Sequence, residues 1–456
     1  MQIKKNRVDV LSLERMCSFS RDQHMTMLVC NYLEYMGYSV KQNTIFDGYY
    51  LLNKYNPKLF FLANSIGALR NFRLMKQAKR YGTIGATLIS EGNFKDGREN
   101  VSQFVWGWNK DKIVYEDVQL QWTERTRSLT LKYFPSLKDK IKVSGGVGFD
   151  VYKISKPIDK DSFLKKYKKQ KYKKVIGVGC WDFGAFYEDD HRYLLNNKCY
   201  SSDQISRFKK DQIAFKNVLK KTILSNKDIL FILKEHPGVI GGRKASAILG
   251  LEKYDNTLIL KNEESVFGCI SVSDFWIVYE STTALESWLL GKQTCLLNPS
   301  GPDFPRDDLH KGSPCYSTFE DIEFAVKSFY HDGCLPDFEK LKDQRQGLVE
   351  DIIQWDDGLN HVRAGNEIIR LLENNKIQKT KILRLVGVLN IVTSHLIWVM
   401  CPYLRFIPAF RVFYERKKSF DLRMLSDNKK KRMNEQITYY KKLGLSKEDL
   451  LKIKCT

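Results

Sequence analysis

One histidine stands where chemistry is common in α/β proteins, within the run Lys234-Glu235-His236-Pro237-Gly238. The residues before this run, 228–233, are mostly apolar and predict a buried strand. Ligands of open α/β sheets bind at the carboxyl ends of the strands. An imidazole there can donate a proton to a phosphate or to a leaving group, which contributes about 10²–10⁴-fold to a rate. A plain turn is the structural alternative, but the position favours a functional histidine.

A second polar run of the same build follows downstream. Residues 275–279 predict another buried strand, and Glu280-Ser281-Thr282-Thr283 separates it from a predicted helix. Thr283 and Glu286 have the spacing of a capping box, which by itself explains a helix start. The free N–H groups of that helix end, with the hydroxyls beside them, also suit an anion such as phosphate. Glu280 is placed to accept a hydrogen bond from a ribose hydroxyl, so the two runs together predict a phosphate-binding edge.

A carboxylate closes a predicted strand much earlier in the chain. Residues 84–90 have the pattern of a strand, and Glu91-Gly92-Asn93 follows it. A carboxylate at a strand end is a candidate general base, whereas a surface turn is the structural alternative. Asp96, Arg98 and Glu99 lie close by in the sequence and stay open as alternatives for the same role.

Motifs of several other chemistries are missing from the sequence. It contains no P-loop, no HExxH and no GxSxG, and no DxD motif lies where a metal-bridged nucleotide would need it. The ten cysteines form no CxxC pair and no His/Cys cluster at zinc spacing. We therefore expect no metal and no cofactor, so that histidine and helix N–H groups would stabilise a departing phosphate. Scattered thiols, and no continuous apolar segment after Met1, predict a cytoplasmic protein.

Segments of strand and helix pattern alternate through most of the chain. Helical segments of about 10–15 residues between strands indicate βαβ units and parallel sheets. The 456 residues are too many for a single core. We expect a first α/β domain over 1–153, a lysine-rich linker over 154–174 and a second α/β domain over 175–375. A basic, helical segment over 376–456 is expected to follow.

The net charge of +22 is concentrated near the C-terminal end. Residues 376–456 hold 19 Lys and Arg against 6 Asp and Glu, which is more than half of the excess. Within them, 382–413 is apolar overall and long enough for a membrane span, but polar residues and two prolines interrupt it. Flanking Lys and Arg are attracted to anionic lipid, which favours a segment that lies on a membrane surface. The alternative is a hydrophobic helical hairpin packed on the α/β domains or on another subunit.

Several stretches, in order along the chain, resemble bacterial surface-carbohydrate biosynthesis proteins of capsule and lipopolysaccharide assembly. They are GATLISEG at 85–92, FVWGW at 104–108, VSGGVGFD at 143–150, the His-Pro run at 234–238 and the helix at 279–291. This family is similar to GT-B glycosyltransferases, including Kdo- and sialyl-transferases, and to the CDP-glycerol glycerophosphotransferases of teichoic acid synthesis. Gln293 stands where the family has proline.

The resemblance implies a GT-B-like α/β fold, in which two Rossmann-like domains face a cleft. The first domain would bind the acceptor, with Glu91 as base, and the second would bind the nucleotide donor, with His236 acting on the donor phosphate. Ser281 and Thr282 would bind that phosphate. The whole donor-binding set would comprise Lys234, Glu235, Pro237, Gly238, Glu280, Ser281, Thr282, Thr283 and Glu286.

The function expected from these observations is metal-independent, inverting transfer of a sugar from a nucleotide sugar. By resemblance the donor carries a CMP-linked acidic sugar, and the acceptor is a surface polysaccharide or a lipid-linked glycan. The enzyme would be peripheral on the inner face of the cytoplasmic membrane. One alternative is transfer of a polyol phosphate from a CDP-glycerol-type donor. Another is a non-catalytic membrane- or nucleic-acid-binding protein, although the basic charge is not interleaved with stacking aromatics as nucleic-acid binding would favour.

Overall fold

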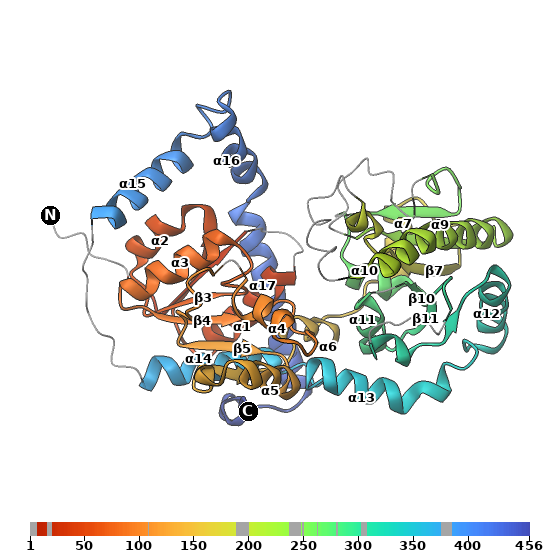
Figure 1. Ribbon diagram of the computed structural model, residues 1–456, viewed down its shortest axis with the longest axis horizontal. Coiled ribbons are helices and arrows are strands. Elements are labelled where there is room, and N and C mark those ends of the chain that lie inside the picture. Colours follow the sequence, from red (N-terminus) through yellow and green to blue (C-terminus); the bar gives the residue numbers. More distant parts are fainter. Residues whose placement is uncertain are drawn as a thin grey trace. The chain divides into compact units, whose positions relative to one another are not determined.

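The computed structural model describes residues 7–15, 21–107, 109–187, 200–236, 248, 250–261, 263–279, 281–301, 308–374 and 385–456. Three residues of the predicted site, Pro237, Gly238 and Glu280, lie outside these ranges. The chain forms two compact units (Figure 1). Unit 1 comprises Met1–Ser155 and Glu350–Thr456, and unit 2 comprises Lys156–Val349.

Unit 1 is built on a parallel sheet with the strand order β2-β1-β3-β4-β5-β6. Its central strands β1, β3 and β4 are buried along their whole length, as expected where helices cover both faces. The order reverses between β1 and β3, which is the flavodoxin-like arrangement. The strands are β1 (Val10–Glu14), β2 (Val40–Thr44), β3 (Leu59–Leu62), β4 (Ile84–Leu88), β5 (Val118–Gln121) and β6 (Ile141–Val143).

Helices from both ends of the chain cover this sheet. One face packs on α1 (Arg21–Tyr35) together with α14 (Asn360–Asn374) and α17 (Leu422–Lys442). The other face packs on α2 (Gly48–Tyr55) and α3 (Leu69–Arg80). The remaining helices of unit 1 include α4 (Arg98–Val105), α5 (Glu124–Tyr133), α6 (Val151–Ile154) and α18 (Lys447–Lys452).

The C-terminal third of the chain therefore divides differently from the expected boundaries. The domain expected over 175–375 ends at Val349 as a compact unit, and α14 belongs to unit 1. Gly145 and Gly146 make room for the returning chain, because a Cβ at Gly145 would lie 1.9 Å from the Asn360 side chain. The Gly146 N–H donates to the Ile353 carbonyl at 3.0 Å. The glycine-rich run at 143–150 is thus a docking point for the start of α14.

Unit 2 is built on a second parallel sheet, with the order β12-β11-β10-β7-β8-β9. This is the Rossmann order, in which the reversal lies between the first strand, β7, and the fourth, β10. The strands are β7 (Lys174–Gly179), β8 (Ile229–Lys234), β9 (Thr257–Leu260), β10 (Phe275–Val278), β11 (Gln293–Leu297) and β12 (Cys315–Tyr316). The predicted α/β class, with two parallel-sheet domains, is confirmed.

Helices cover both faces of the second sheet as well. One hydrophobic core lies under α9 (Ser202–Ser225) and α12 (Phe319–Asp332). The other lies under α7 (Lys160–Lys166), α10 (Val266–Val272) and α11 (Thr283–Leu289). The chain leaves unit 2 through α13 (Lys342–Ile353).

Two further helices, α15 (Leu385–Met400) and α16 (Pro408–Ser419), form a hairpin that stands against α2 of unit 1 (Figure 1). In the described part of the chain, no helix combines the length and the apolar character that crossing a membrane requires. The basic segment expected over 376–456 is not one element, because α17 and α18 belong to the core of unit 1 through Tyr440 and Leu450.

Candidate functional site

The predicted histidine lies beside the strand reversal of unit 2. His236 follows β8 by two residues, and β8 pairs with β7, which in turn pairs with β10. The run at 281–283 follows β10. The carboxyl ends of these three adjacent strands therefore meet at one edge, where open α/β sheets bind their ligands.

An aspartate that the sequence reasoning missed stands next to His236. Asp182 lies in the loop after β7, and its Oδ2 is 3.5 Å from Nδ1 of His236. The Asp182 side chain is 5% exposed, while that of His236 is 40% exposed. A buried carboxylate at one ring nitrogen fixes the orientation of an imidazole. The only local signal for Asp182 was its position after a predicted strand.

Lys234 and Glu235 have structural partners at the β8–β9 edge. The Lys234 ammonium donates to the carbonyl of Lys261, and the Glu235 carboxylate pairs with the Lys261 ammonium at 2.9 Å. Both side chains are buried. Backbone bonds fix the same turn, since the Cys180 N–H donates to the Lys234 carbonyl and the Glu235 N–H to the Leu260 carbonyl. The two side chains hold the turn that presents His236.

The turn before α11 differs from the predicted capping box. The N-cap position belongs to Thr282, whose side chain makes no capping hydrogen bond. Instead, the Ser281 hydroxyl accepts the Thr283 N–H at 3.2 Å and lies 3.0 Å from the Thr283 hydroxyl. The capping prediction for Thr283 and Glu286 is therefore wrong, because Thr283 is already inside the helix. Glu286 N–H bonds back to the Thr282 carbonyl at 3.3 Å.

Two glycines of β7 allow this turn to lie close to the sheet. A Cβ at Gly179 would be 2.5 Å from the Thr283 hydroxyl, and one at Gly177 would be 2.1 Å from the Trp276 ring. The Trp276 indole N–H donates to that same Thr283 hydroxyl at 3.0 Å. Because Gly177 and Gly179 have no side chains, the start of α11 can lie close to the strand reversal.

A buried aspartate ties together the neighbouring strand ends. Asp211 on α9 accepts from the Tyr279 hydroxyl at 2.5 Å and from the Ser300 hydroxyl at 2.6 Å. Tyr279 follows β10, and Ser300 follows β11. Tyr279 also packs against Trp181, with ring centroids 5.3 Å apart. This network joins the ends of β10 and β11 to α9, and nothing in the local sequence around Asp211 indicated it.

Glu91 belongs to unit 1, whereas the other candidate residues belong to unit 2. It is exposed, in the turn after β4. Trp122 shapes this turn, because its indole N–H donates to the Ile89 carbonyl at 2.6 Å and its ring fills the space that a Cβ at Gly92 would need. Among the alternatives, Asp96 bonds to Lys132 at 2.8 Å and to Tyr133 at 2.6 Å. The hydrogen bond from Lys132 holds the pKa of Asp96 at about 2.

The two units together have counterparts among solved structures. A Listeria monocytogenes protein assigned as a UDP-N-acetylglucosamine 2-epimerase matches with a TM-score of 0.53 and 11% identity, over 83% of this chain and 100% of that one. S. aureus MnaA in complex with UDP matches with a TM-score of 0.51 and 13% identity, over 82% and 99%. The chain has a GT-B-like fold. Comparison of the sequence with protein-family models and with curated proteins gives no match.

In that fold each unit is a Rossmann-like domain, as the sequence predicted. At identities of 11–13% the likeness extends to the fold and no further. The carboxyl edge of unit 2, with the His236–Asp182 pair, is the candidate site. It combines an imidazole oriented by a buried carboxylate with the polar turn before α11. Such a combination can stabilise a phosphate as a leaving group.

Proposed function

We propose that the chain binds a nucleotide sugar at the carboxyl edge of unit 2 and transfers the sugar to an acceptor hydroxyl. The His236–Asp182 pair carries this proposal, because it places a carboxylate-oriented imidazole beside the strand reversal. The GT-B-like fold supports it, since the comparison proteins with the same fold include one that binds UDP.

In the proposed reaction, the acceptor oxygen attacks the anomeric carbon of the donor sugar. The bond between that carbon and the donor phosphate oxygen breaks, and its electron pair leaves with the nucleotide. His236 donates a hydrogen bond or a proton to the departing phosphate, and Asp182 holds the ring in place for it. Glu91 takes the acceptor proton, with Asp96 and Glu99 as the other carboxylates near that turn. The transition state carries developing negative charge on phosphate, so its stabilisation is the main contribution expected of the protein.

The nucleotide of the donor is assigned only as a class. A CMP-linked acidic sugar follows from the sequence resemblance, whereas the complex of MnaA favours a uridine nucleotide. A CDP-glycerol-type donor would use the same phosphate-binding edge.

Epimerisation is the second candidate function. The solved structures with this fold include proteins that carry the name UDP-N-acetylglucosamine 2-epimerase. An epimerase would change the sugar of a nucleotide sugar without any acceptor. A transferase would release the nucleotide only when an acceptor is present.

A donor screen on the full chain tests these proposals. Binding of CMP-, UDP- and GDP-sugars and of CDP-glycerol is measured by calorimetry, nucleotide release is assayed with and without acceptor glycans, and NMR follows the sugar for epimerisation. His236→Gln is expected to lower turnover about 10²–10⁴-fold, because an amide cannot donate a proton. Glu91→Gln is expected to remove acceptor-dependent release while donor binding persists.

Matched variants separate these effects from general damage. His331, on α12 in the same unit, is also beside an aspartate but is exposed, so His331→Gln should leave turnover unchanged. Glu448→Gln, at an exposed position on α18 of unit 1, is the corresponding control for Glu91. If no nucleotide binds, or if His236→Gln turns over as fast as His331→Gln, the proposed site is wrong. Acceptor-independent epimerisation would replace the transferase with the second candidate.

A further inference from the structure

The hairpin of α15 and α16 has one face that unit 1 holds firmly. His395 is 3.1 Å from the Asp47 carboxylate, and its ring stacks on Tyr50 with centroids 3.8 Å apart. Trp398 stacks on Phe46, and the Lys417 ammonium donates to the Trp398 carbonyl at 2.8 Å. The hairpin is thus a fixed part of unit 1, and the inner side of α15 is already occupied.

The opposite face of α15 is apolar and exposed. Its exposed apolar side chains recur at intervals of three to four residues, which places them on one side of the helix. Leu389 is 56% exposed and Leu396 is 54% exposed. No Asp, Glu, Lys or Arg occurs between Leu385 and Met400. The face comprises Val388, Leu389, Val392, Leu396, Val399 and Met400.

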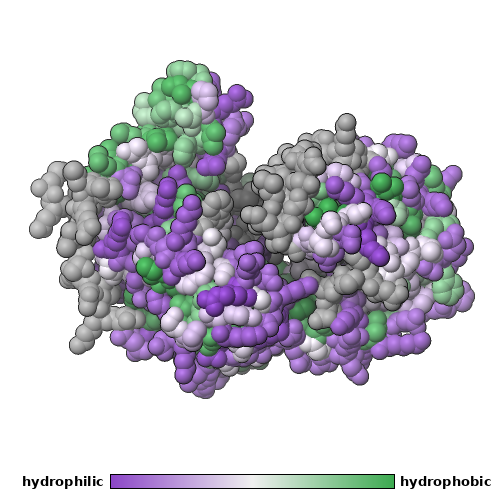
Figure 2. All heavy atoms as spheres, viewed as in Figure 1, coloured by the Kyte–Doolittle hydropathy of each residue, from purple (hydrophilic) through white to green (hydrophobic). Residues whose placement is uncertain are grey.

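The turn of the hairpin exposes its largest apolar side chains. Tyr403 is 73% exposed and Phe406 is 76% exposed. In Figure 2 the hydrophobic surface runs over α15 and continues to this turn. Contiguous exposed apolar surface of this kind marks a docking site for another molecule or a membrane.

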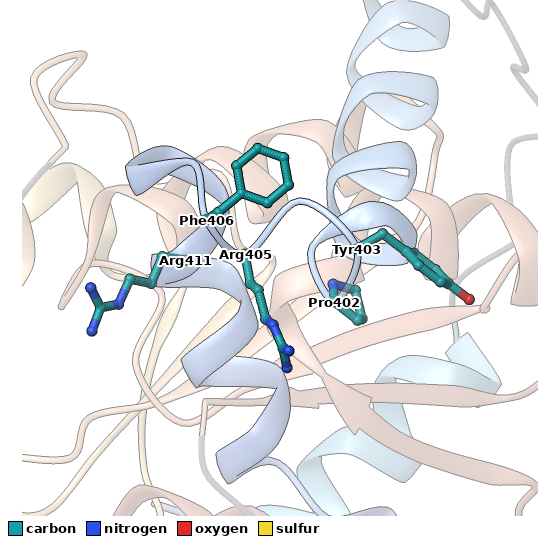
Figure 3. A pocket seen from close by; sticks show the side chains of 5 residues that line it. All are labelled: Pro402, Tyr403, Arg405, Phe406 and Arg411. Carbon is teal, nitrogen blue, oxygen red and sulfur yellow. The ribbon is translucent and has the colours of Figure 1, made fainter.

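Positive charge surrounds this apolar surface. Arg405 and Arg411 line a shallow pocket at the turn, together with Pro402, Tyr403 and Phe406 (Figure 3). In the last turn of α16, Lys418 adds an exposed cation, while Arg416 and Lys417 contact Phe46 and Trp398. Within α16 the only acidic residue is Glu415. An apolar face bordered by Arg and Lys, with exposed aromatic residues beside it, matches the interface of an anionic lipid leaflet.

We propose that the outer face and turn of the α15–α16 hairpin dock the protein on an anionic bilayer surface. Leu389, Leu396 and Phe406 enter the boundary between headgroups and acyl chains, while Arg405 and Arg411 bind lipid phosphates. The proposal narrows the basic segment expected over 376–456 to the hairpin, because α17 and α18 are built into unit 1. It does not depend on the proposed catalytic function.

Co-sedimentation of the full chain with vesicles tests this docking. Vesicles of phosphatidylcholine alone are compared with vesicles that contain about 30 mol% phosphatidylglycerol, because basic segments are attracted to anionic lipid. The wild type is expected to bind the anionic vesicles and to be released by salt. Arg405→Gln and Arg411→Gln should each weaken binding about fivefold. The double variant Leu396→Ser/Phe406→Ser should lose binding almost completely.

Phe324→Ser supplies the matched control, because Phe324 is also strongly exposed but lies on α12 of unit 2. Circular dichroism and thermal unfolding check that each variant folds as the wild type does, which is expected because every substituted side chain is exposed. Failure of the wild type to bind anionic vesicles would overturn the proposal, as would equal binding by the double variant. If sedimentation velocity shows a dimer that Leu396→Ser/Phe406→Ser dissociates, a second copy of the chain covers this face instead of lipid.

Discussion

Four histidines of the described chain each lie beside an aspartate, and their surroundings give each pair a different role. His331 and Asp332 are both exposed at the end of α12. His361 is fully buried between Asp150 and Tyr440. His395 joins the hairpin to Asp47. His236 alone combines a buried carboxylate with a half-exposed ring at a strand end. A His–Asp pair by itself therefore does not identify a site, whereas the burial of the aspartate, the exposure of the ring and the position at a strand end do.

Glu116 gives unit 1 a pH-dependent stability at the residue scale. Burial raises its pKa from 4.5 to about 7. The Ser65 hydroxyl donates to this carboxyl, and Asp117, Lys79 and Lys140 are the charges that act on it. Between pH 4.5 and about 7 the folded chain keeps a proton that the unfolded chain has lost. Stability therefore falls as pH rises through this window, by about 3 kcal/mol, and this contribution is constant above it.

Glu116→Gln is expected to remove that loss, since the amide resembles the protonated carboxyl. Urea unfolding measures the free energy of unfolding of the variant and of the wild type at about pH 5, 6, 7 and 8, which covers the window. The variant should gain stability relative to the wild type as the pH rises. Glu99→Gln, at an exposed position, should follow the wild type at every pH. Parallel curves for wild type and Glu116→Gln would contradict the assignment of the proton to Glu116.

At the scale of elements, the distance between β7 and the start of α11 sets the position of the polar turn 281–283 in the candidate site. The strands β7, β8 and β10 could be predicted because their central residues are continuous apolar runs. The edge strand β2 was missed, since its sequence Val-Lys-Gln-Asn-Thr is polar and only its two ends are buried. The capping pattern at 283–286 placed the N-cap one residue too late, because the N-cap is Thr282. The Thr283 hydroxyl instead accepts from the Trp276 indole, and the Thr283 N–H donates to the Ser281 hydroxyl.

Gly179→Ala tests the control that β7 exerts on α11. The added methyl would meet the Thr283 hydroxyl and the Trp276 indole nitrogen within 2.9 Å. We expect a loss of about 1–3 kcal/mol in stability, together with weaker nucleotide binding, because the turn before α11 must move away. Gly347→Ala on α13 is the control, since a methyl there meets open space and alanine favours the helix. Unchanged unfolding and binding in Gly179→Ala would show that the turn adapts without cost.

At the scale of the whole molecule, unit 1 is completed by residues from the far end of the chain. Asp150 accepts from the Asn360 side chain at 2.9 Å and from the His361 N–H at 2.7 Å. His361 continues to the Tyr440 hydroxyl at 2.5 Å. Thr456 exchanges backbone hydrogen bonds with Val143 beside β6. The first 155 residues therefore do not bury their own sheet without α14 and α17.

His361→Ala should destabilise unit 1 by about 3–5 kcal/mol, because it leaves the Asp150 carboxylate buried without its ring partner. Hydrogen exchange should rise in α1, α14 and α17 and stay as in the wild type within unit 2. The exposed His331→Ala is the control. Equal loss of protection in both units would show that the two unfold as one and would contradict the division into units.

The sequence by itself determined the class of the protein: alternating strand and helix patterns, two parallel sheets and a histidine at the carboxyl end of a strand. These features are local, because hydrophobic periodicity and strand ends can be read within a dozen residues. Only the tertiary structure decided that Asp182 stands beside His236, that Asp211 joins two strand ends and that α14 and α17 return to unit 1. Each of these depends on contacts between residues far apart in the chain, for which single-sequence patterns carry no signal.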